Sequence, residues 1–172
     1  PTGIDLTGES PGISPTPEFK KRRYKQTWYP GDTVTAGIGQ SFWVTTPLQV
    51  AQATTIVSMK GQAFKPKMLH ATRHPGKSAL DINPPDPITP LILKDPKNWD
   101  YMIASMVSVV HTPNGTARKL GVNIPYKIAG KTGTAQVKSI APNSDYNASR
   151  LLKKHPDHAW FTAFAPAYDP KI

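Results

Sequence analysis

Prolines constrain this chain more than any other feature. The sequence has 172 residues, of which 19 are proline. Proline lacks a backbone N–H and fixes φ near −65°, so helix interiors and central strands exclude it. Seven prolines fall between Pro66 and Pro96, and four between Pro11 and Pro30. The sequence therefore predicts extended loop with short strand pieces over residues 1–31, and loop with at most one short strand over residues 66–96.

A first helix is predicted from Pro47 to near Gly61. Thr46 can serve as its N-cap, Pro47 suits the first helical position, and Gln49 completes a capping box with Thr46. The residues that follow are apolar on most sides of the helix. This pattern is typical of a buried helix.

A second helix is predicted after Asp95, whose side chain can cap it, with Pro96 just inside. Its apolar residues recur at three- and four-residue spacing and form one face: Trp99, Met102, Ile103, Met106, Val107 and Val110. The helix is expected to end before the turn sequence Pro113–Asn114–Gly115. Gly115–Thr116–Ala117 then predicts another short helical turn, with Asn114 or Thr116 as its cap.

Two strands are predicted near the end of the chain. Tyr126–Val137 is rich in small and β-branched residues, and His158–Pro166 is apolar enough on both faces to be a central strand. The polar link between them, Lys138–Asp157, is too long for a tight hairpin. Two long helices and a late strand pair, without regular alternation of strand and helix, predict an α+β fold.

The charge is strongly positive, with a formal net charge of +10. The densest patch is Lys20–Arg23 with Lys25, flanked by Phe19, Tyr24 and Trp28. Such a patch is compatible with nucleic acid, with anionic lipid or with a polyanionic cell-wall polymer, and equally with a solvated basic loop. The absence of cysteine excludes disulfides and thiolate metal sites. No apolar run approaches the roughly 20 residues that span a bilayer.

The sequence Gly130–Thr134 reads Gly-Lys-Thr-Gly-Thr and is compatible with two kinds of site. A phosphate-binding loop needs a glycine five residues before Gly130, where the backbone wraps around the phosphates. That position is Pro125, which lacks both the N–H and the free φ that the wrap requires. Such a loop also leads into a helix, whereas the residues after Thr132 predict a continuing strand. The pattern therefore favours an edge strand that binds a peptide carboxylate.

Each residue of that strand suits a separate task. Lys131 supplies a cation, and the hydroxyls of Thr132 and Thr134 suit a carboxylate. Gly133 removes a side chain, so that a ligand can lie close to the backbone. The Thr134 N–H is expected to point at a developing oxyanion. Lys-Thr-Gly is a common triplet, however, so this interpretation needs support from the rest of the chain.

That support comes from five motifs in a fixed order, which resemble those of class B penicillin-binding proteins, with the elongation-specific peptidoglycan D,D-transpeptidases as the most similar group. They are Trp28–Asp32, Gly37–Gln40, Thr46–Gln49, His111–Ala117 and Lys131–Gln136. The resemblance covers nearly the whole chain. It implies part of a penicillin-binding or β-lactamase-like domain, with an antiparallel sheet flanked by helices.

The resemblance implies an activity and a set of site residues. Family members cleave the terminal D-Ala-D-Ala bond of a stem peptide through a serine acyl-enzyme, which is then transferred to a neighbouring amine, and β-lactams acylate the same serine. Lys131, Thr132, Gly133 and Thr134 would bind substrate. The Thr134 N–H would complete the oxyanion hole and its C=O would accept the substrate amide. Lys131 and Thr134 are thus the expected catalytic residues of this chain.

The family's nucleophile motif, Ser-x-x-Lys, and its second motif, Ser-x-Asn, do not occur here. Ser78 and Ser149 lack the lysine, and Ser139 and Ser144 lack the asparagine. Because both motifs precede this segment in the family, residues 1–172 are expected to be an excised piece of one transpeptidase domain. It would lack the upstream nucleophile part and the final strand and helix. The isolated chain is therefore expected to be inactive.

Further expectations concern ligands, partners and location. His111 is expected to be a cap or surface residue, as a lone histidine at a helix end more often is, and the resemblance implies no catalytic use of it. His70, His74, His155 and His158 lack metal-site spacing. The resemblance implies stem peptides and β-lactams as ligands, with no cofactor, metal or nucleic acid, and a membrane glycosyltransferase of the elongation machinery as partner. It implies the bacterial periplasm, with the complete protein anchored in the inner membrane by an N-terminal segment. The alternatives are a penicillin-sensing or β-lactamase-like domain, and a nonenzymatic basic binding module.

Overall fold

A computed structural model of the chain describes residues 1–135 and 157–172. These residues form two compact units. The first consists of residues 1–53 and 63–89, and the second of residues 54–62 and the described part of 90–172. Helix α3, Pro47–Ser58, begins in the first unit and ends in the second.

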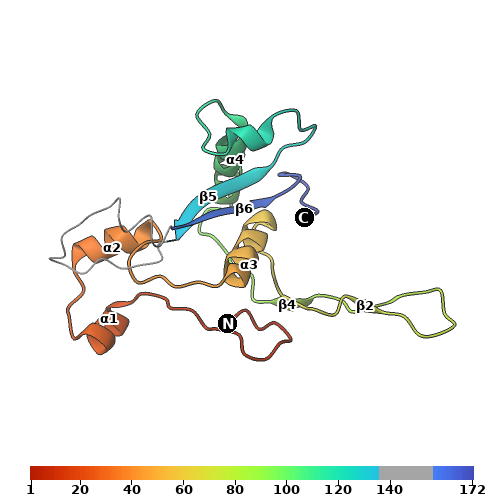
Figure 1. Ribbon diagram of the computed structural model, residues 1–172, viewed down its shortest axis with the longest axis horizontal. Helices are drawn as coiled ribbons and strands as arrows, with labels where there is room; N and C mark the ends of the chain where they lie inside the picture. Colours follow the sequence, from red (N-terminus) through yellow and green to blue (C-terminus); the bar gives the residue numbers. More distant parts are fainter. Residues whose placement is uncertain (136–156) are drawn as a thin grey trace. The chain divides into compact units, whose positions relative to one another are not determined.

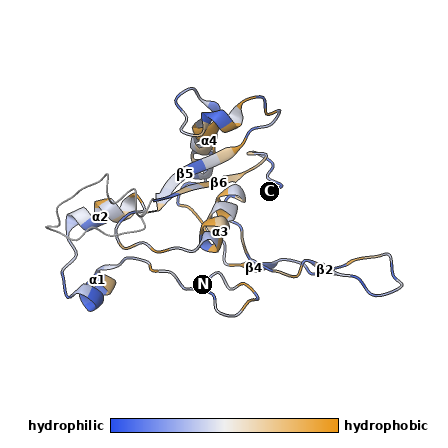
Figure 2. Cartoon of the chain, viewed as in Figure 1, coloured by the Kyte–Doolittle hydropathy of each residue, from blue (hydrophilic) through white to orange (hydrophobic). Residues whose placement is uncertain are grey.

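The first unit contains two short helices, α1 (Pro17–Tyr24) and α2 (Pro30–Gly37). The prediction of extended loop over residues 1–31 is therefore wrong for α1. Both prolines lie at the first helical position, where the missing N–H costs no hydrogen bond. The Phe19 N–H donates to Thr16 Oγ1 over 3.0 Å, so Thr16 caps α1. Figure 2 shows that α1 is largely hydrophilic, which is why no apolar periodicity marks it.

The capping box predicted for α3 is confirmed. The Gln49 N–H donates to Thr46 Oγ1 over 3.2 Å, and the Thr46 N–H donates to Gln49 Oε1 over 3.0 Å. The prediction that this helix is buried is wrong, because none of its residues is fully buried. Apolar residues on most sides of a helix need packing partners on most sides. Among the residues of α3 that lie in the second unit, only Val57 is packed against the hydrophobic core.

The first unit also contains a narrow antiparallel ribbon. Strand β1 (Ala63–Lys65) pairs with β4 (Asp86–Ile88), and β2 (Ala71–Thr72) pairs with β3 (Asp81–Ile82). The prediction of at most one short strand over residues 66–96 is therefore wrong, since three lie there. Pro87 is tolerated within β4 because this strand has a single strand partner among the described residues, and an edge strand needs no donor on its outer side.

The second unit is built around α4 (Lys97–His111), η1 (Arg118–Gly121), β5 (Ala129–Ala135) and β6 (His158–Phe164). The Asp95 carboxylate accepts the Lys97 N–H over 2.9 Å, so the predicted cap of α4 is confirmed. The buried core consists of Ile103, Ala129, Phe164 and Ala167, with Val57, Met106 and Val107 packed against it. Met102 lies outside the buried face, with 41% of its surface exposed.

The short helical turn after α4 lies further along the chain than predicted. It begins at Arg118, and neither Asn114 nor Thr116 caps it through a side-chain hydrogen bond. The predicted strand pair is confirmed: β5 and β6 run antiparallel, with Lys131 opposite Thr162 and Gly133 opposite Trp160 (Figure 1). Gln136, Val137 and the link 138–156 lie outside the described residues. Helices and small antiparallel sheets together confirm the α+β class.

Candidate active site

Strand β5 presents the Lys-Thr-Gly-Thr sequence on an accessible edge. In the part of the chain that the structure describes, β5 pairs with β6 alone, so its other edge has no strand partner. Lys131, Gly133 and Thr134 are exposed, and Thr132 is half-buried. A β-carbon added at Gly133 would meet a described atom only at 3.6 Å, on Trp160. The glycine is therefore not required by packing within this chain, and its missing side chain leaves room beside the strand.

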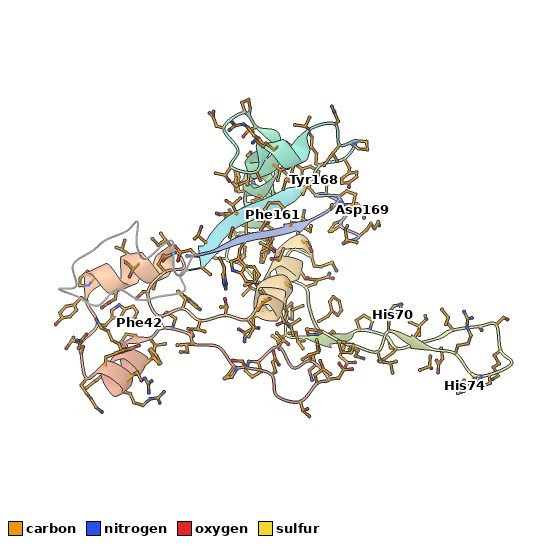
Figure 3. The ribbon with its side chains drawn as sticks, viewed as in Figure 1. Phe42, His70, His74, Phe161, Tyr168 and Asp169 are labelled. Carbon is orange, nitrogen blue, oxygen red and sulfur yellow. The ribbon has the colours of Figure 1, made fainter. Side chains whose placement is uncertain are left out.

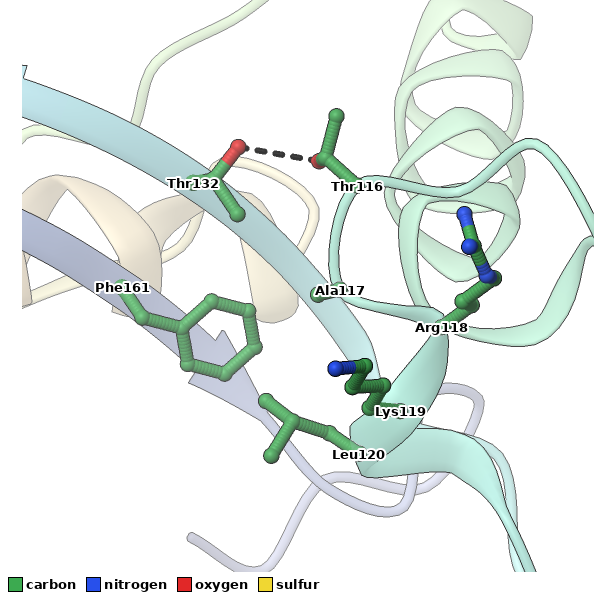
Figure 4. Close-up of a pocket in the computed structure, with 7 residues that line it drawn as sticks. All are labelled: Thr116, Ala117, Arg118, Lys119, Leu120, Thr132 and Phe161. Carbon is green, nitrogen blue, oxygen red and sulfur yellow. Dashed lines mark hydrogen bonds between the residues drawn. The ribbon is translucent and has the colours of Figure 1, made fainter.

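Two hydrogen bonds define the polar groups of this strand. The Lys131 ammonium donates to the Thr132 carbonyl over 2.5 Å. The Thr132 and Thr116 hydroxyl oxygens lie 3.0 Å apart and share a hydrogen bond (Figure 4). Thr116 is a contact of this strand that the sequence did not indicate, since its position suggested only a helix cap. The signal that could have found it is its place in one of the five family motifs.

The turn after α4 carries Thr116 to the strand. The Gly115 N–H donates to the Thr112 carbonyl over 3.0 Å, and the Ala117 N–H donates to the Val109 carbonyl over 3.0 Å. The chain thus folds back over the last turn of α4. A β-carbon at Gly115 would lie 2.3 Å from the Val109 carbonyl oxygen, which a real side chain could not occupy. Glycine is required here because the backbone itself fills the space.

The end of α4 is also attached to the start of β5. His111 Nε2 accepts the Ile128 N–H over 2.9 Å. Burial, and then the charge of Lys127, lower the pKa of His111 below 6.5, which favours the neutral ring that can accept this bond. His111 therefore has a structural role, joining helix to strand.

Gly130 allows close packing near the start of β5. A β-carbon at Gly130 would lie 2.6 Å from the Phe161 ring and 3.3 Å from Val110.

A cavity of about 380 Å³ lies beside these contacts, within the second unit. It is lined by residues from β5, β6 and the turn after α4: Thr116, Ala117, Arg118, Lys119, Leu120, Thr132 and Phe161 (Figure 4). Its apolar lining residues are Ala117, Leu120 and Phe161, and the two bonded hydroxyls lie together at one side. The free hydrogen-bonding capacity of Thr132 and Thr116 is thus available at a solvent-accessible surface.

The basic patch of the first unit is not a uniform surface. Lys20 is only 4% exposed, and its ammonium lies 2.7 Å from Asp32 Oδ2 and 4.8 Å from the centre of the Tyr29 ring. The Tyr29 N–H also donates to Asp32 Oδ2, over 2.7 Å. The hydrogen bond from Lys20, and then that from Tyr29, lower the pKa of Asp32. A solvated basic loop, one of the possibilities for Lys20–Lys25, therefore does not describe Lys20, which is buried and paired with Asp32.

Figure 3 shows His70 and His74 along the ribbon of the first unit, and both are exposed. Among residues 1–135 and 157–172, no group of three or more His, Cys, Asp or Glu side chains is arranged to hold a metal ion. His155 lies outside these residues. No described helix is long and apolar enough to cross a membrane.

Comparison with known proteins identifies the class. The penicillin binding protein transpeptidase domain matches residues 1–172, and the chain belongs to this family. Peptidoglycan D,D-transpeptidase MrdA of Haemophilus influenzae is 42% identical over 174 residues, a match covering 100% of this chain and 26% of that protein. The crystal structure of Pseudomonas aeruginosa PBP2 in complex with WCK 5153 is 39% identical, with a TM-score of 0.75, covering 97% of this chain and 33% of that one.

A third similar structure is the complex between penicillin-binding protein PBP2 and MreC from Helicobacter pylori. It is 33% identical, with a TM-score of 0.71, and the match covers 99% of this chain and 28% of that one. The resemblance to class B penicillin-binding proteins, and within them to penicillin-binding protein 2, is therefore confirmed. This chain spans about a quarter of the curated relative that it matches.

Proposed function

We propose that the complete protein containing this chain is a serine-type peptidoglycan D,D-transpeptidase and a target of β-lactams. The observation that supports this most is the Lys-Thr-Gly-Thr strand, exposed along an edge that has no strand partner among the described residues. An extended peptide can add to such an edge as a further strand, with main-chain hydrogen bonds supplying affinity. The family and the named relatives support the same activity.

The proposed reaction has two steps. A serine hydroxyl attacks the carbonyl of the terminal D-Ala-D-Ala bond, giving an acyl-enzyme and releasing D-alanine with the serine proton. The amine of a neighbouring stem peptide then attacks the acyl carbonyl, which forms the cross-link and frees the serine. A β-lactam acylates the same serine through its ring carbonyl. Serine is weakly nucleophilic without a positioned base, so this chemistry requires the Ser-x-x-Lys and Ser-x-Asn motifs.

Within this scheme, residues of β5 stabilise charge and hold the substrate. Lys131 places its ammonium beside the nucleophile and the substrate carboxylate, which the hydroxyls of Thr132 and Thr134 also bind. The Thr134 N–H stabilises the oxyanion, and Gly133 lets the peptide lie close. The hydrogen bond from the Lys131 ammonium to the Thr132 carbonyl supports this arrangement. A carbonyl that an exposed side chain can reach is one that a ligand beside the strand could also reach. In an antiparallel strand, alternate residues direct their N–H and C=O groups to the same edge. The N–H and C=O of Thr134 would therefore lie on the same edge of β5 as the Thr132 carbonyl.

The proposal extends to the rest of the protein. Residues 1–172 are one part of a single transpeptidase domain, with the nucleophile motifs upstream and a further strand and helix downstream. The enzyme acts in the bacterial periplasm, anchored in the inner membrane by an N-terminal segment. It works with a membrane glycosyltransferase of the elongation machinery. The Helicobacter pylori complex of PBP2 with MreC supports a role in a larger assembly only in general terms.

Labelling with a fluorescent penicillin tests the proposal. The complete protein should form one covalent adduct per molecule, seen by intact mass, and should release D-alanine from a pentapeptide while forming cross-links. Residues 1–172 alone should form none, because no Ser-x-x-Lys occurs in them. A complete protein that is not acylated would overturn the proposal. Rapid hydrolysis of the penicillin without cross-linking would indicate a β-lactamase, and a stable adduct without any cross-linking would indicate a sensor.

A further inference from the structure

We propose that Thr116 is a positioning residue for substrate binding. Its hydroxyl donates to Thr132 Oγ1, and this directs the Thr132 proton toward the carboxylate of the bound peptide or β-lactam. The inference rests on the proposed function, which assigns a carboxylate-bearing ligand to β5. Its geometric basis is the 3.0 Å contact between the two hydroxyl oxygens, one on the strand and one on the turn after α4 (Figure 4).

The position of Thr116 is fixed by its neighbours on both sides in sequence. Gly115 is packed against the carbonyl oxygens of Ser108 and Val109, with no room for a side chain. The Ala117 N–H donates to the Val109 carbonyl, and the Arg118 N–H donates to the Gly115 carbonyl over 3.2 Å. The backbone of Thr116 is thus held against the end of α4. A hydroxyl held in this way can direct the hydroxyl of a neighbouring residue.

The other partner is held just as closely. Strand β5 begins at the core residue Ala129, and His111 holds the preceding Ile128 to the end of α4. Gly130 has no side chain, which lets Phe161 and Val110 approach the strand. The same helix end therefore places both threonines. Their contact follows from packing, and it does not require ligand to form.

The chemistry of two hydroxyls gives this contact a direction when ligand binds. Each hydroxyl has one proton to donate and two lone pairs to accept with. If Thr132 donated to Thr116, it would have no proton left for a carboxylate, which only accepts. A carboxylate beside Thr132 therefore selects the order in which Thr116 donates to Thr132 and Thr132 donates to the ligand. Successive hydrogen bonds of this kind polarise one another and strengthen the last one.

Loss of the Thr116 hydroxyl should weaken the binding of ligand and leave the acylation step unchanged. The carboxylate is present both in the bound complex and in the transition state, so loss of this interaction should weaken binding uniformly. In the complete protein, Thr116→Val should raise the dissociation constant of the non-covalent penicillin complex about three- to tenfold, the range expected for one hydrogen bond. The acylation rate constant at saturation should stay within about twofold of the wild-type value.

A double-mutant cycle separates positioning from general damage. In a Thr132→Val background, Thr116→Val should have no further effect. In the wild-type background, Thr116→Ser keeps the hydroxyl and should bind penicillin as the wild type does. A penicillin whose carboxylate is esterified should bind equally well to the Thr116→Val variant and the wild type. Thr112→Val is the matched control, because Thr112 lies in the same turn but its hydroxyl donates to the Ser108 carbonyl, over 2.7 Å. It should leave penicillin binding unchanged.

Several outcomes would overturn the inference. These are an equal loss from Thr116→Val in both backgrounds, a loss that extends to the esterified penicillin, and no loss at all. If Thr116→Val does not fold, as judged by its thermal midpoint, Thr116→Ala removes the same hydroxyl with less bulk and takes its place. A wild-type complete protein that no penicillin acylates would refute the proposed function itself, and that result is distinguishable from the others.

Discussion

The two units of this chain are stabilised in different ways. In the second unit the buried apolar residues gather around one strand pair, with Ile103, Ala129, Phe164 and Ala167 at the centre. In the first unit Ala63 is the only buried apolar residue, and the other buried side chains are those of Thr2 and Lys20. The strand that carries the candidate site thus lies in the unit with the packed core.

Polar contacts take the place of a core in the first unit. The Lys20–Asp32 pair joins α1 to the start of α2. Lys67 donates to Asn83 Oδ1, to the Pro84 carbonyl and to Asp86 Oδ1, all within 3.1 Å. Apolar packing stabilises through many small, non-directional contacts, whereas each polar contact depends on two particular groups. The comparison predicts that single substitutions act differently in the two units.

The largest expected effect is on chemistry in the second unit. In the complete protein, Lys131→Ala should lower the rate of acylation by penicillin about 100- to 1000-fold, the usual cost of removing one group that stabilises charge in the transition state. Its thermal midpoint should change little, because Lys131 is exposed. Stopped-flow acylation and thermal unfolding measure the two quantities. Lys171→Ala is the control, since Lys171 is exposed, bonded to Asp169, and should leave acylation unchanged. A large fall in the thermal midpoint of Lys131→Ala would contradict this separation.

The second prediction compares one substitution in each unit. Val110 is 1% exposed and packed in the second unit, whereas Val34 in the first unit is 68% exposed. Val110→Ala should lower the free energy of unfolding by about 2–3 kcal/mol, from lost transfer energy and the cavity left behind. Val34→Ala should change it by less than about 0.5 kcal/mol. Denaturant titration of the complete protein measures both, and equal losses would remove the distinction between the units.

The third prediction concerns the ion pair of the first unit. The pKa of Asp32 is held below 3.8 by its bonds from Lys20 and Tyr29. A carboxylate with a lowered pKa stabilises the folded state above pH 3.8, and this stability is lost as the pH falls below that value. Asp32→Asn should therefore lower the thermal midpoint by a few degrees at neutral pH, and by progressively less as the pH falls through this range. A difference that does not depend on pH would show that the carboxylate charge is not what stabilises the fold.

The smallest effect is expected from the exposed cations of α1 and from Lys25, the residue that follows it. Lys21, Arg22, Arg23 and Lys25 are exposed, and no described acidic side chain forms a salt bridge with any of them. Replacing these four by glutamine in the complete protein should leave penicillin acylation within about threefold of the wild-type rate, less than 0.7 kcal/mol in activation free energy. A 100-fold loss would place the basic helix in the active site. Lys20→Met, which removes the buried member of the patch, should instead lower the thermal midpoint.

Local sequence patterns predicted much of this fold. The caps at Thr46 and Asp95 are contacts between residues two or three positions apart, so the sequence alone could indicate them. The face of α4 follows from the helical period, and the strand at Lys131 follows from its residue types. The prediction for Pro17 is wrong because the residues after it are mostly hydrophilic and show no apolar period, so the Thr-Pro pair alone did not indicate a helix. Thr16 caps this helix.

Contacts between distant residues needed the tertiary structure. Lys20 and Asp32 are 12 residues apart, and the run of basic residues around Lys20 gave no sign that one of them turns inward. Thr116 and Thr132 are 16 residues apart and lie in different family motifs. The sequence by itself determined that the Lys-Thr-Gly-Thr segment lies in a strand, because residue type and spacing act locally. Only the tertiary structure decided what the Thr132 hydroxyl is bonded to, because that depends on how the end of α4 folds back onto β5.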